Sequence, residues 1–192
     1  MRYLLFFGNI RPYKGVDFLL DAWQGLRSDF PDLRLVIAGR LWGQNQSTPA
    51  KLIHKIAGTS SYAKVIEEKL ADHPDVIQDL NFLPEEKLYS YLRIAEFGVF
   101  PYSSFESQSG AASMAAGFGL PIVSTNVGGL GQLAINEDFL CQSNSATSLR
   151  DCLEALLRRN DLDLKAKQLE KAGQYSWHAS ANSHASCYEG LF

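Results

Sequence analysis

The sequence predicts an α/β protein in which a mainly parallel sheet lies between two layers of helices. Short apolar runs of strand length alternate with longer segments whose apolar residues recur at helical spacing. The apolar runs contain few polar residues, as strands do when a sheet is covered on both faces. Strands that alternate with helices pair in parallel through right-handed crossovers. With 192 residues, 46% of them hydrophobic, the chain is long enough to bury a substantial core as one domain.

The first part of the chain contains two apolar runs and one amphipathic segment. Tyr3–Phe7 is a short apolar run that ends at Gly8, so it is predicted to be a buried strand. Apolar residues at helical spacing predict a helix over Val16–Arg27. Pro31 interrupts the chain, and Leu33–Ala38 follows as the second predicted strand.

The middle of the chain is more polar. Residues 40–61 are predicted to form a long loop with one helical turn around Leu52–Ile56. Tyr62–Ala71 predicts a helix, and Val76–Ile77 begins a short strand. A further helix is predicted to start at Pro84, because a proline is followed by acidic residues in the first turn, where the helix dipole favours negative charge.

The last part of the chain repeats the alternation. Phe97–Phe100 and Pro121–Thr125 are predicted strands, and the small residues of Ser109–Gly117 predict a helix between them. Leucines and a cysteine at helical spacing predict an amphipathic helix over Leu149–Leu157. The tail, Ser176–Phe192, is predicted to form a last helix. The sequence contains no internal repeat and no low-complexity segment, so residues 1–192 are predicted to form one domain.

Composition and charge exclude several classes of partner. The net charge of −3 gives no electrostatic reason to expect nucleic acid or an anionic membrane. Met1–Gly8 is too short for a signal peptide, and no apolar run is long enough to cross a bilayer. We therefore expect a cytoplasmic protein.

The cysteines and histidines predict neither a disulfide framework nor a metal site. Cys141, Cys152 and Cys187 are odd in number and far apart, which is typical of a reducing compartment. The four histidines and these cysteines do not have the spacing of metal ligands. No structural zinc is expected.

The loop Gly8–Gly15 contains two cations, Arg11 and Lys14, between the first strand and the first helix. Backbone N–H groups at a helix start add partial positive charge, so this loop can hold a diphosphate. The loop is neither a Walker A sequence nor a G-x-G-x-x-G fingerprint, which disfavours an ATPase or a dinucleotide-binding protein. The alternative is that both cations are solvated surface charges.

Two further loops follow predicted strands. Residues 101–114 form a serine- and glycine-rich turn that opens a helix, so its amides and small side chains can accept an anion. Glu106 in this turn can hydrogen-bond sugar hydroxyls; the alternative is a helix cap with a solvated acid. Asn126–Gln132 contains three glycines, and a plain turn explains this segment equally well.

Taken together, these segments resemble the C-terminal domain of retaining glycosyltransferases of the GT-B fold, in the large "glycosyl transferases group 1" family. The matching segments, in the order of the family, are FFGNIRPYKGVDFLLDAW, LRLVIAG, VFPYSSFESQSG, AAGFGLPIVSTNVGGL and YSWHASANSHASCYEGLF. The resemblance covers nearly the whole chain. It implies a Rossmann-like three-layer α/β/α domain, one half of a GT-B fold, that binds a UDP- or GDP-linked sugar as substrate.

The resemblance also implies roles for individual residues. Arg11 and Lys14 would contact the diphosphate and stabilise the leaving nucleotide, and Glu106, the first acid of the family's E-x7-E motif, would contact the sugar hydroxyls. The residues assigned to donor binding are Gly8, Asn9, Phe82, Leu83, Ser109, Gly110, Ala111 and Met114. Members of this family need no metal and no cofactor, because cations and helix dipoles supply the positive charge.

The chain departs from the family pattern at three positions. Asn9 stands where an arginine usually follows the first-loop glycine, and Arg11 can substitute for it. Met114 occupies the position of the second acid of E-x7-E, which normally holds the ribose, and methionine accepts hydrogen bonds poorly. Gln132 stands where a glutamate is common.

We expect the family's N-terminal domain, which binds the acceptor, to be absent, because Met1 lies almost directly before the first predicted strand. Half of a cleft is expected to retain little rate enhancement. The expected partners are therefore a nucleotide sugar and an N-terminal domain, a separate chain or a second copy. A peripheral link to a membrane is expected only through the missing half.

Three hypotheses follow for function. The first is the donor-binding domain of a retaining glycosyltransferase, and the second is a non-catalytic module that binds a nucleotide sugar or a partner. The third is a sugar-nucleotide epimerase, because some epimerases share the two-domain fold; its expected catalytic acids and histidine are not evident in this sequence.

Overall fold

The computed structural model describes residues 1–42, 62–159 and 163–189. The described strands form one six-stranded sheet in the order β3-β2-β1-β4-β5-β6, and every neighbouring pair is parallel. The strands are β1 (Arg2–Phe7), β2 (Leu33–Ala38), β3 (Ile77–Asp79), β4 (Phe97–Phe100), β5 (Ile122–Thr125) and β6 (Leu140–Cys141). This arrangement confirms the predicted Rossmann-like α/β fold.

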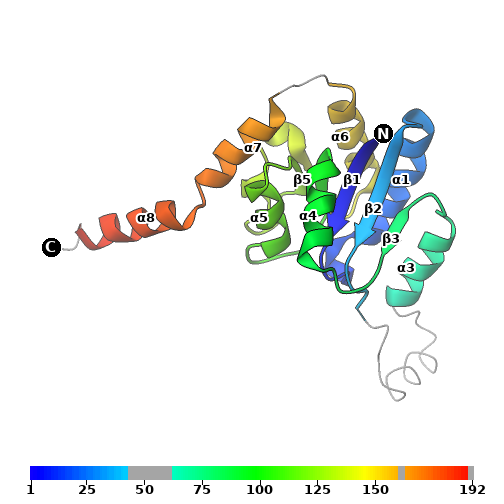
Figure 1. The fold of residues 1–192 in the computed structure, drawn as a ribbon, viewed down its shortest axis with the longest axis horizontal. Coiled ribbons are helices and arrows are strands. Elements are labelled where there is room, and N and C mark those ends of the chain that lie inside the picture. Colours follow the sequence, from blue (N-terminus) through cyan, green and yellow to red (C-terminus); the bar gives the residue numbers. More distant parts are fainter. Residues whose placement is uncertain (43–61, 160–162, 190–192) are drawn as a thin grey trace, which may run out of the picture.

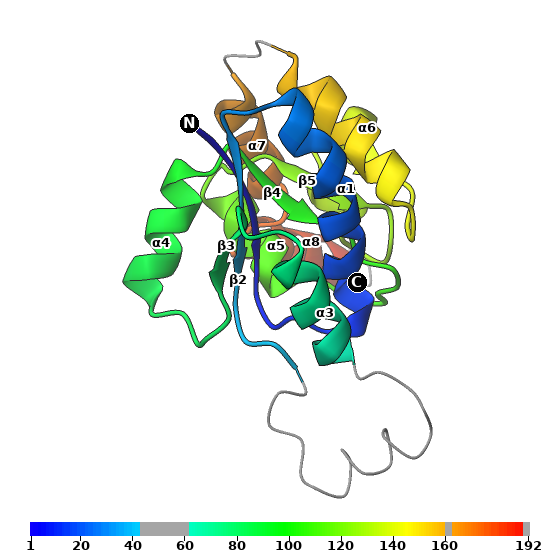
Figure 2. The ribbon, with the colours of Figure 1, turned by 90° about the vertical axis from the view of Figure 1, so that its right-hand side faces the viewer.

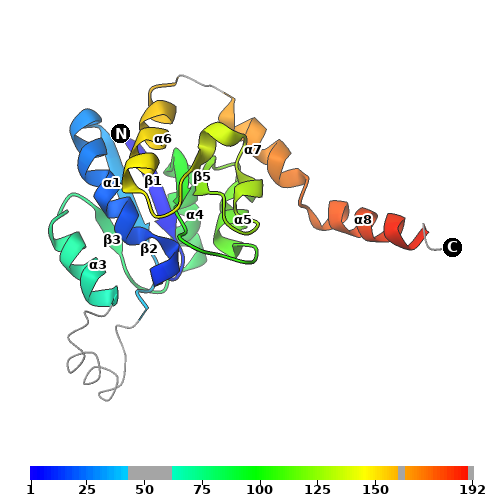
Figure 3. The same cartoon turned by 180° about the vertical axis from the view of Figure 1, so that it is seen from behind.

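Helices cover both faces of the sheet. Figures 2 and 3 show α1, α3 and α6 over one face, and Figure 1 shows α4 and α5 over the other. The described helices are α1 (Val16–Asp29), α3 (Tyr62–Ala71), α4 (Glu85–Ile94), α5 (Gly110–Gly117), α6 (Ala146–Leu157), α7 (Leu164–Gly173) and α8 (Trp177–Glu189). The apolar runs seen in the sequence become the buried strands, because both of their faces lie under helices.

The buried apolar side chains form one core that includes the sheet and the helices on both of its faces. Its largest fully buried side chains include Trp23 of α1, Phe6 of β1 and Phe100 of β4. Trp23 also donates its indole N–H to Asp75 at 2.9 Å, so the buried ring keeps a hydrogen bond. Burial of each side chain of this size stabilises the fold by about 1.5–3 kcal/mol. The loops at the edge of the sheet are therefore attached to a stable core.

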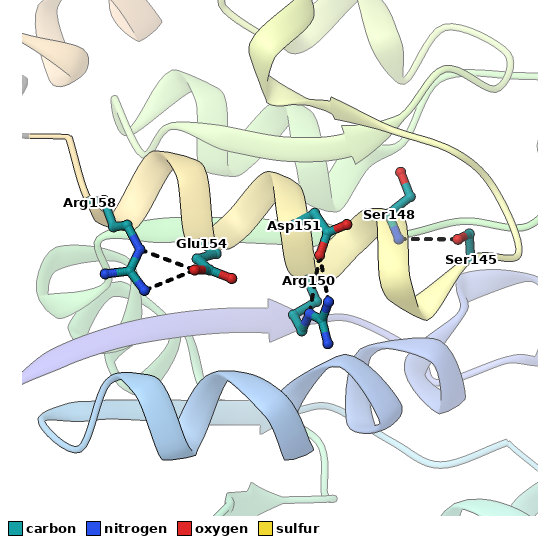
Figure 4. A network of polar contacts seen from close by, with 6 residues as sticks. All are labelled: Ser145, Ser148, Arg150, Asp151, Glu154 and Arg158. Carbon is teal, nitrogen blue, oxygen red and sulfur yellow. Dashed lines mark hydrogen bonds and ion pairs between the residues drawn. The ribbon is translucent and has the colours of Figure 1, made fainter.

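Helix α6 shows how local polar contacts fix the end of an element. Its N-cap, Ser145, accepts a hydrogen bond from the backbone N–H of Ser148 at 3.1 Å, and Arg158 pairs with Glu154 at 2.8 Å one turn earlier (Figure 4). The cap places the start of α6 at Ala146, earlier than the predicted start at Leu149. Arg158 also lies over the ring of Phe30, which ties α6 to the end of α1.

Two elements were not predicted. β6 has only two residues, too few for a recognisable apolar run. α7 has a single buried side chain, the polar Gln168, so it lacks the apolar stripe from which helices are predicted. The predicted loop over residues 40–61 lies mostly outside the described residues.

The predicted tail helix is present as α8, which begins at Trp177. Figure 1 shows α8 extending away from the sheet beyond α7. No side chain of α8 is buried, and Trp177 is 93% exposed. Within residues 1–42, 62–159 and 163–189, none of the helices combines the length and the apolar character needed to cross a membrane.

Candidate functional site

The site lies where the order of the strands reverses. β1 has β2 on one side and β4 on the other, so the loops that follow β1 and β4 leave the carboxyl edge of the sheet in different directions. In open parallel sheets, this divergence opens the crevice in which ligands bind. Both predicted anion-binding loops follow these two strands.

The loop after β1 is pressed against the loop after β4. Gly15 has φ +67° and is the N-cap of α1; a Cβ at this position would lie 2.0 Å from the carbonyl oxygen of Pro101. Only glycine fits this approach and this backbone conformation. The rings of Tyr13 and Phe105 stack at 5.6 Å, which joins the two loops a second time.

The turn after β5 completes the cluster of loops. Gly128 has φ +52°, and a Cβ there would lie 2.5 Å from the carbonyl oxygen of Phe105. Gly129 donates its N–H to the carbonyl of Ser107 at 3.3 Å. The glycine-rich segment Asn126–Gln132 therefore supports the loop that carries Glu106.

Lys14 is a buried cation in the middle of this cluster. Its side chain is 8% exposed, and Nζ donates a hydrogen bond to the hydroxyl of Tyr102 at 2.8 Å. Nζ also lies 4.7 Å from the centre of the Tyr102 ring. Burial, helped by the nearby charge of Arg11, lowers the pKa of Lys14 to about 8. Among the described residues, no carboxylate forms an ion pair with Lys14.

The start of α5 adds further donors. Ser109 is the N-cap of this helix, and its Oγ accepts the N–H of Ala112 at 3.3 Å. The first-turn amides of a helix have no carbonyl partner within the helix, and the helix dipole makes this end positive. Nothing lies within 4 Å of the position that a Cβ would take on Gly110, so a ligand can approach the backbone there.

A hollow of about 490 Å³ lies beside these groups. It is lined by Phe7, Gly8, Asn9, Gly39, Arg40, Asn81, Phe82, Leu83, Leu88 and Ala111. Five of the residues predicted to bind the donor are therefore brought together in one cavity. The ammonium of Lys14 lies next to it, 3.6 Å from the position that a Cβ would take on Gly8.

The other predicted residues lie outside the lining of this hollow. Arg11 and Glu106 are exposed in the two loops, and Met114 is 42% exposed on α5. Met114 follows Ala111 by three positions, so the two share a helix face. Gln132 is exposed and accepts a hydrogen bond from Gln108 at 3.4 Å. Lys14 thus lies next to the hollow, whereas Arg11 and Glu106 are carried by the two loops that pack against each other.

Six residues of the site were not predicted: five line the hollow (Phe7, Gly39, Arg40, Asn81 and Leu88), and the sixth is Tyr102. Arg40 follows β2 after Gly39 and lines the hollow; its place after a buried strand is a signal that the sequence contains. Tyr102 is fully buried below Lys14, and in the sequence it is indistinguishable from a core aromatic residue.

Lys14, the amides at the start of α5 and the neighbouring hollow together can bind a large anion. Burying a cation without a charged partner is unfavourable, and a bound anion beside Lys14 would offset that cost. Cations and helix-start amides around an open hollow are suited to phosphate groups. The hollow next to them has room for a base or a sugar.

Solved structures place this architecture among the C-terminal domains of GT-B glycosyltransferases. The C-terminal domain of the group 1 family glycosyl transferase LpcC from Francisella tularensis has a TM-score of 0.62 at 18% identity, covering 89% of this chain and 82% of that one. HepE from Anabaena, solved in complex with UDP-glucose, has a TM-score of 0.69 at 16% identity, covering 99% of this chain and 49% of that one. At these identities the likeness concerns the fold.

The family model described as "Glycosyl transferases group 1" matches residues 1–175, so the chain belongs to this family. The resemblance inferred from the motifs is therefore confirmed. The D-inositol 3-phosphate glycosyltransferase of Geodermatophilus obscurus is 31% identical over 191 residues, which cover 96% of this chain and 39% of the relative. The chain thus spans about two fifths of the length of the curated relatives that it matches.

Proposed function

We propose that this chain is the donor-binding half of a retaining glycosyltransferase that uses a UDP- or GDP-linked hexose. The main support is Lys14, a buried cation with no carboxylate partner among the described residues, beside the positive end of α5. A nucleoside diphosphate would supply the missing negative charge. Its base would occupy the hollow near Phe82 and Leu83.

In the proposed reaction, the bond between the anomeric carbon and the diphosphate oxygen breaks, and the electron pair stays on the diphosphate. Lys14, Arg11 and the amides of Ser109, Gly110 and Ala111 would stabilise this charge. Glu106 would accept hydrogen bonds from the sugar hydroxyls. The acceptor hydroxyl, held by another domain, would bond to the anomeric carbon on the same face and pass its proton to the leaving diphosphate oxygen.

The proposal includes a second domain or chain. This chain covers 39% of the first curated relative, which is therefore about two and a half times as long as the matching segment. Transfer requires the acceptor to be held against the donor, so residues 1–192 alone are expected to bind the donor without transferring the sugar. Addition of the completing domain should restore transfer. Neither step is expected to need a metal ion, so EDTA should leave donor binding unchanged.

Calorimetric titration of the chain with UDP, GDP and ADP tests the site. We expect saturable binding of one nucleotide, about 10- to 100-fold weaker in Lys14→Ala, the range for a hydrogen bond to a charged group. Lys165→Ala is the matched control, because Lys165 lines a different hollow together with Glu96 and Pro121, which precede β4 and β5. Equal affinity of Lys14→Ala and the wild type would refute the site.

A non-catalytic module is the second candidate, and Met114 favours it. A methionine that is 42% exposed on α5 would replace the acid that holds the ribose in the family. If loss of this contact has weakened an otherwise intact donor site, Met114→Glu should tighten UDP binding about tenfold. If no nucleotide binds to the wild type or to this variant, the chain is better explained as a partner-binding module.

A further inference from the structure

Tyr102 lies directly below the candidate phosphate site, on the loop between β4 and α5. It is fully buried, and its ring contacts those of Phe100, Tyr13 and Phe105 at 6.2, 5.8 and 5.3 Å between centroids. Its carbonyl oxygen accepts the hydroxyl of Thr125 at 2.7 Å. Core packing therefore fixes the position of the Tyr102 hydroxyl.

The Tyr102 hydroxyl is hydrogen-bonded to both Lys14 and Ser109. An ammonium can only donate, so the Tyr102 oxygen accepts from Lys14 at 2.8 Å. The Tyr102 hydroxyl and Ser109 Oγ are hydrogen-bonded at 2.9 Å, with either oxygen able to donate, and Oγ also accepts the N–H of Ala112. Burial raises the pKa of Tyr102 to about 12, so the hydroxyl keeps its proton near neutral pH. The chain of bonds links the cation of the first loop to the N-cap of α5.

We propose that Tyr102 is a positioning residue of the donor site, whose hydroxyl holds the charged Lys14 side chain against the start of α5, where the diphosphate binds. This inference rests on the proposed function. A lysine side chain has four rotatable bonds, so its ammonium group has a fixed position only when a neighbouring group holds it. Tyr102 supplies that fixed point without touching the donor itself.

The pH dependence of binding reports this role. The charged or titratable groups facing Lys14 are Arg11 and Tyr13 on its own loop and Tyr102 on the opposing loop. The charged ammonium binds the diphosphate, so affinity is highest below the pKa of Lys14, about 8 in the free protein, and falls as the pH rises above it. Removing the Tyr102 oxygen removes an acceptor of the charged form, which lowers this pKa further.

The test is the substitution Tyr102→Phe in the full chain, because it removes one oxygen and keeps the ring. UDP affinity is measured from about pH 6 to about pH 9, and the Lys14 pKa is followed by NMR in lysine labelled with carbon-13. We expect affinity about tenfold weaker at neutral pH, a fall-off that begins at lower pH, and a lower Lys14 pKa. Tyr3→Phe is the control, because it removes a hydroxyl from β1 near Met1.

The possible outcomes distinguish failure of the proposed donor site from failure of the positioning role of Tyr102. If the wild type binds UDP and Lys14→Ala binds it more weakly, an unchanged affinity and pH profile in Tyr102→Phe overturns the positioning role alone. If the wild type does not bind UDP or any other nucleoside diphosphate, the proposed function fails. The NMR titration then decides the link between the two side chains separately, since an unchanged Lys14 pKa in Tyr102→Phe refutes it.

Discussion

Lys14 and Gln168 are both long polar side chains buried in an otherwise apolar protein, and they differ in how their polar atoms are satisfied. Gln168 on α7 accepts the N–H of Ile122 at 3.0 Å and donates to the carbonyl of Leu133 at 2.9 Å. Lys14 has a tyrosine hydroxyl and aromatic faces as its partners among the described residues. The amide of Gln168 is neutral and bonded through both its oxygen and its nitrogen, whereas Lys14 is a cation without a counter-ion among the described residues.

The difference separates a structural polar residue from a functional one. A buried amide with both ends bonded joins α7 to β5 and to the turn at Leu133, and it leaves nothing for a ligand to supply. A buried ammonium without an anion destabilises the free protein. A bound anion offsets this destabilisation, and charged groups of this kind are typical of binding and catalytic sites. This contrast predicts opposite effects on stability when each side chain is made apolar.

The largest effect is expected for Gln168→Leu. The N–H of Ile122 and the carbonyl of Leu133 would lose their partners inside the protein, at about 1–3 kcal/mol for each buried group. The free energy of unfolding should fall by about 2–4 kcal/mol, measured by urea denaturation. The control is Gln24→Leu on the exposed side of α1, where a surface change should stay within about 0.5 kcal/mol. Equal effects of the two variants would contradict the structural role.

A smaller effect of opposite sign is expected for Lys14→Met. The methionine fills the same space, and the Tyr102 hydroxyl keeps its bond to Ser109. Removing the buried cation should raise the free energy of unfolding by about 1 kcal/mol, since apolar replacements of buried charges are often stabilising. The same variant should lose diphosphate binding, so stability and function move in opposite directions. A loss of stability would mean that Lys14 is a structural residue.

The fold could be predicted from the sequence wherever apolar pattern decides the structure. The strands over Leu33–Ala38 and Phe97–Phe100 and the helix over Tyr62–Ala71 have the predicted bounds, because each follows its own run of apolar residues. α7 could not be predicted in this way. Its contact with the sheet is made by Gln168, whose partners lie 46 and 35 residues away and become visible only in the folded chain.

The candidate site was predicted in part for a similar reason. Lys14 and Ser109 lie in loops that follow buried strands, and this position together with the resemblance to the family marks them as candidates. Tyr102 was missed because its link to Lys14 spans 88 residues, and a tyrosine next to a buried strand looks like a core residue. Whether Arg11 and Glu106 touch a ligand stays a prediction.

The smallest effect, and the most specific one, is the pH dependence of the stability difference between Lys14→Met and the wild type. The folded chain lowers the pKa of Lys14 from 10.5 to about 8, mainly through burial. Between these values the unfolded chain keeps a proton that the folded chain has lost, so folding of the wild type becomes more favourable as the pH rises. The wild type should therefore be less stable than Lys14→Met below about pH 8, and the difference should narrow toward about pH 10. Paired urea denaturations across this range measure the difference directly, and all other titrating groups cancel between the two proteins. If the stability difference between the two proteins does not change with pH, Lys14 titrates as an exposed lysine does. The burial of Lys14 without an anionic partner would then no longer support an anion site.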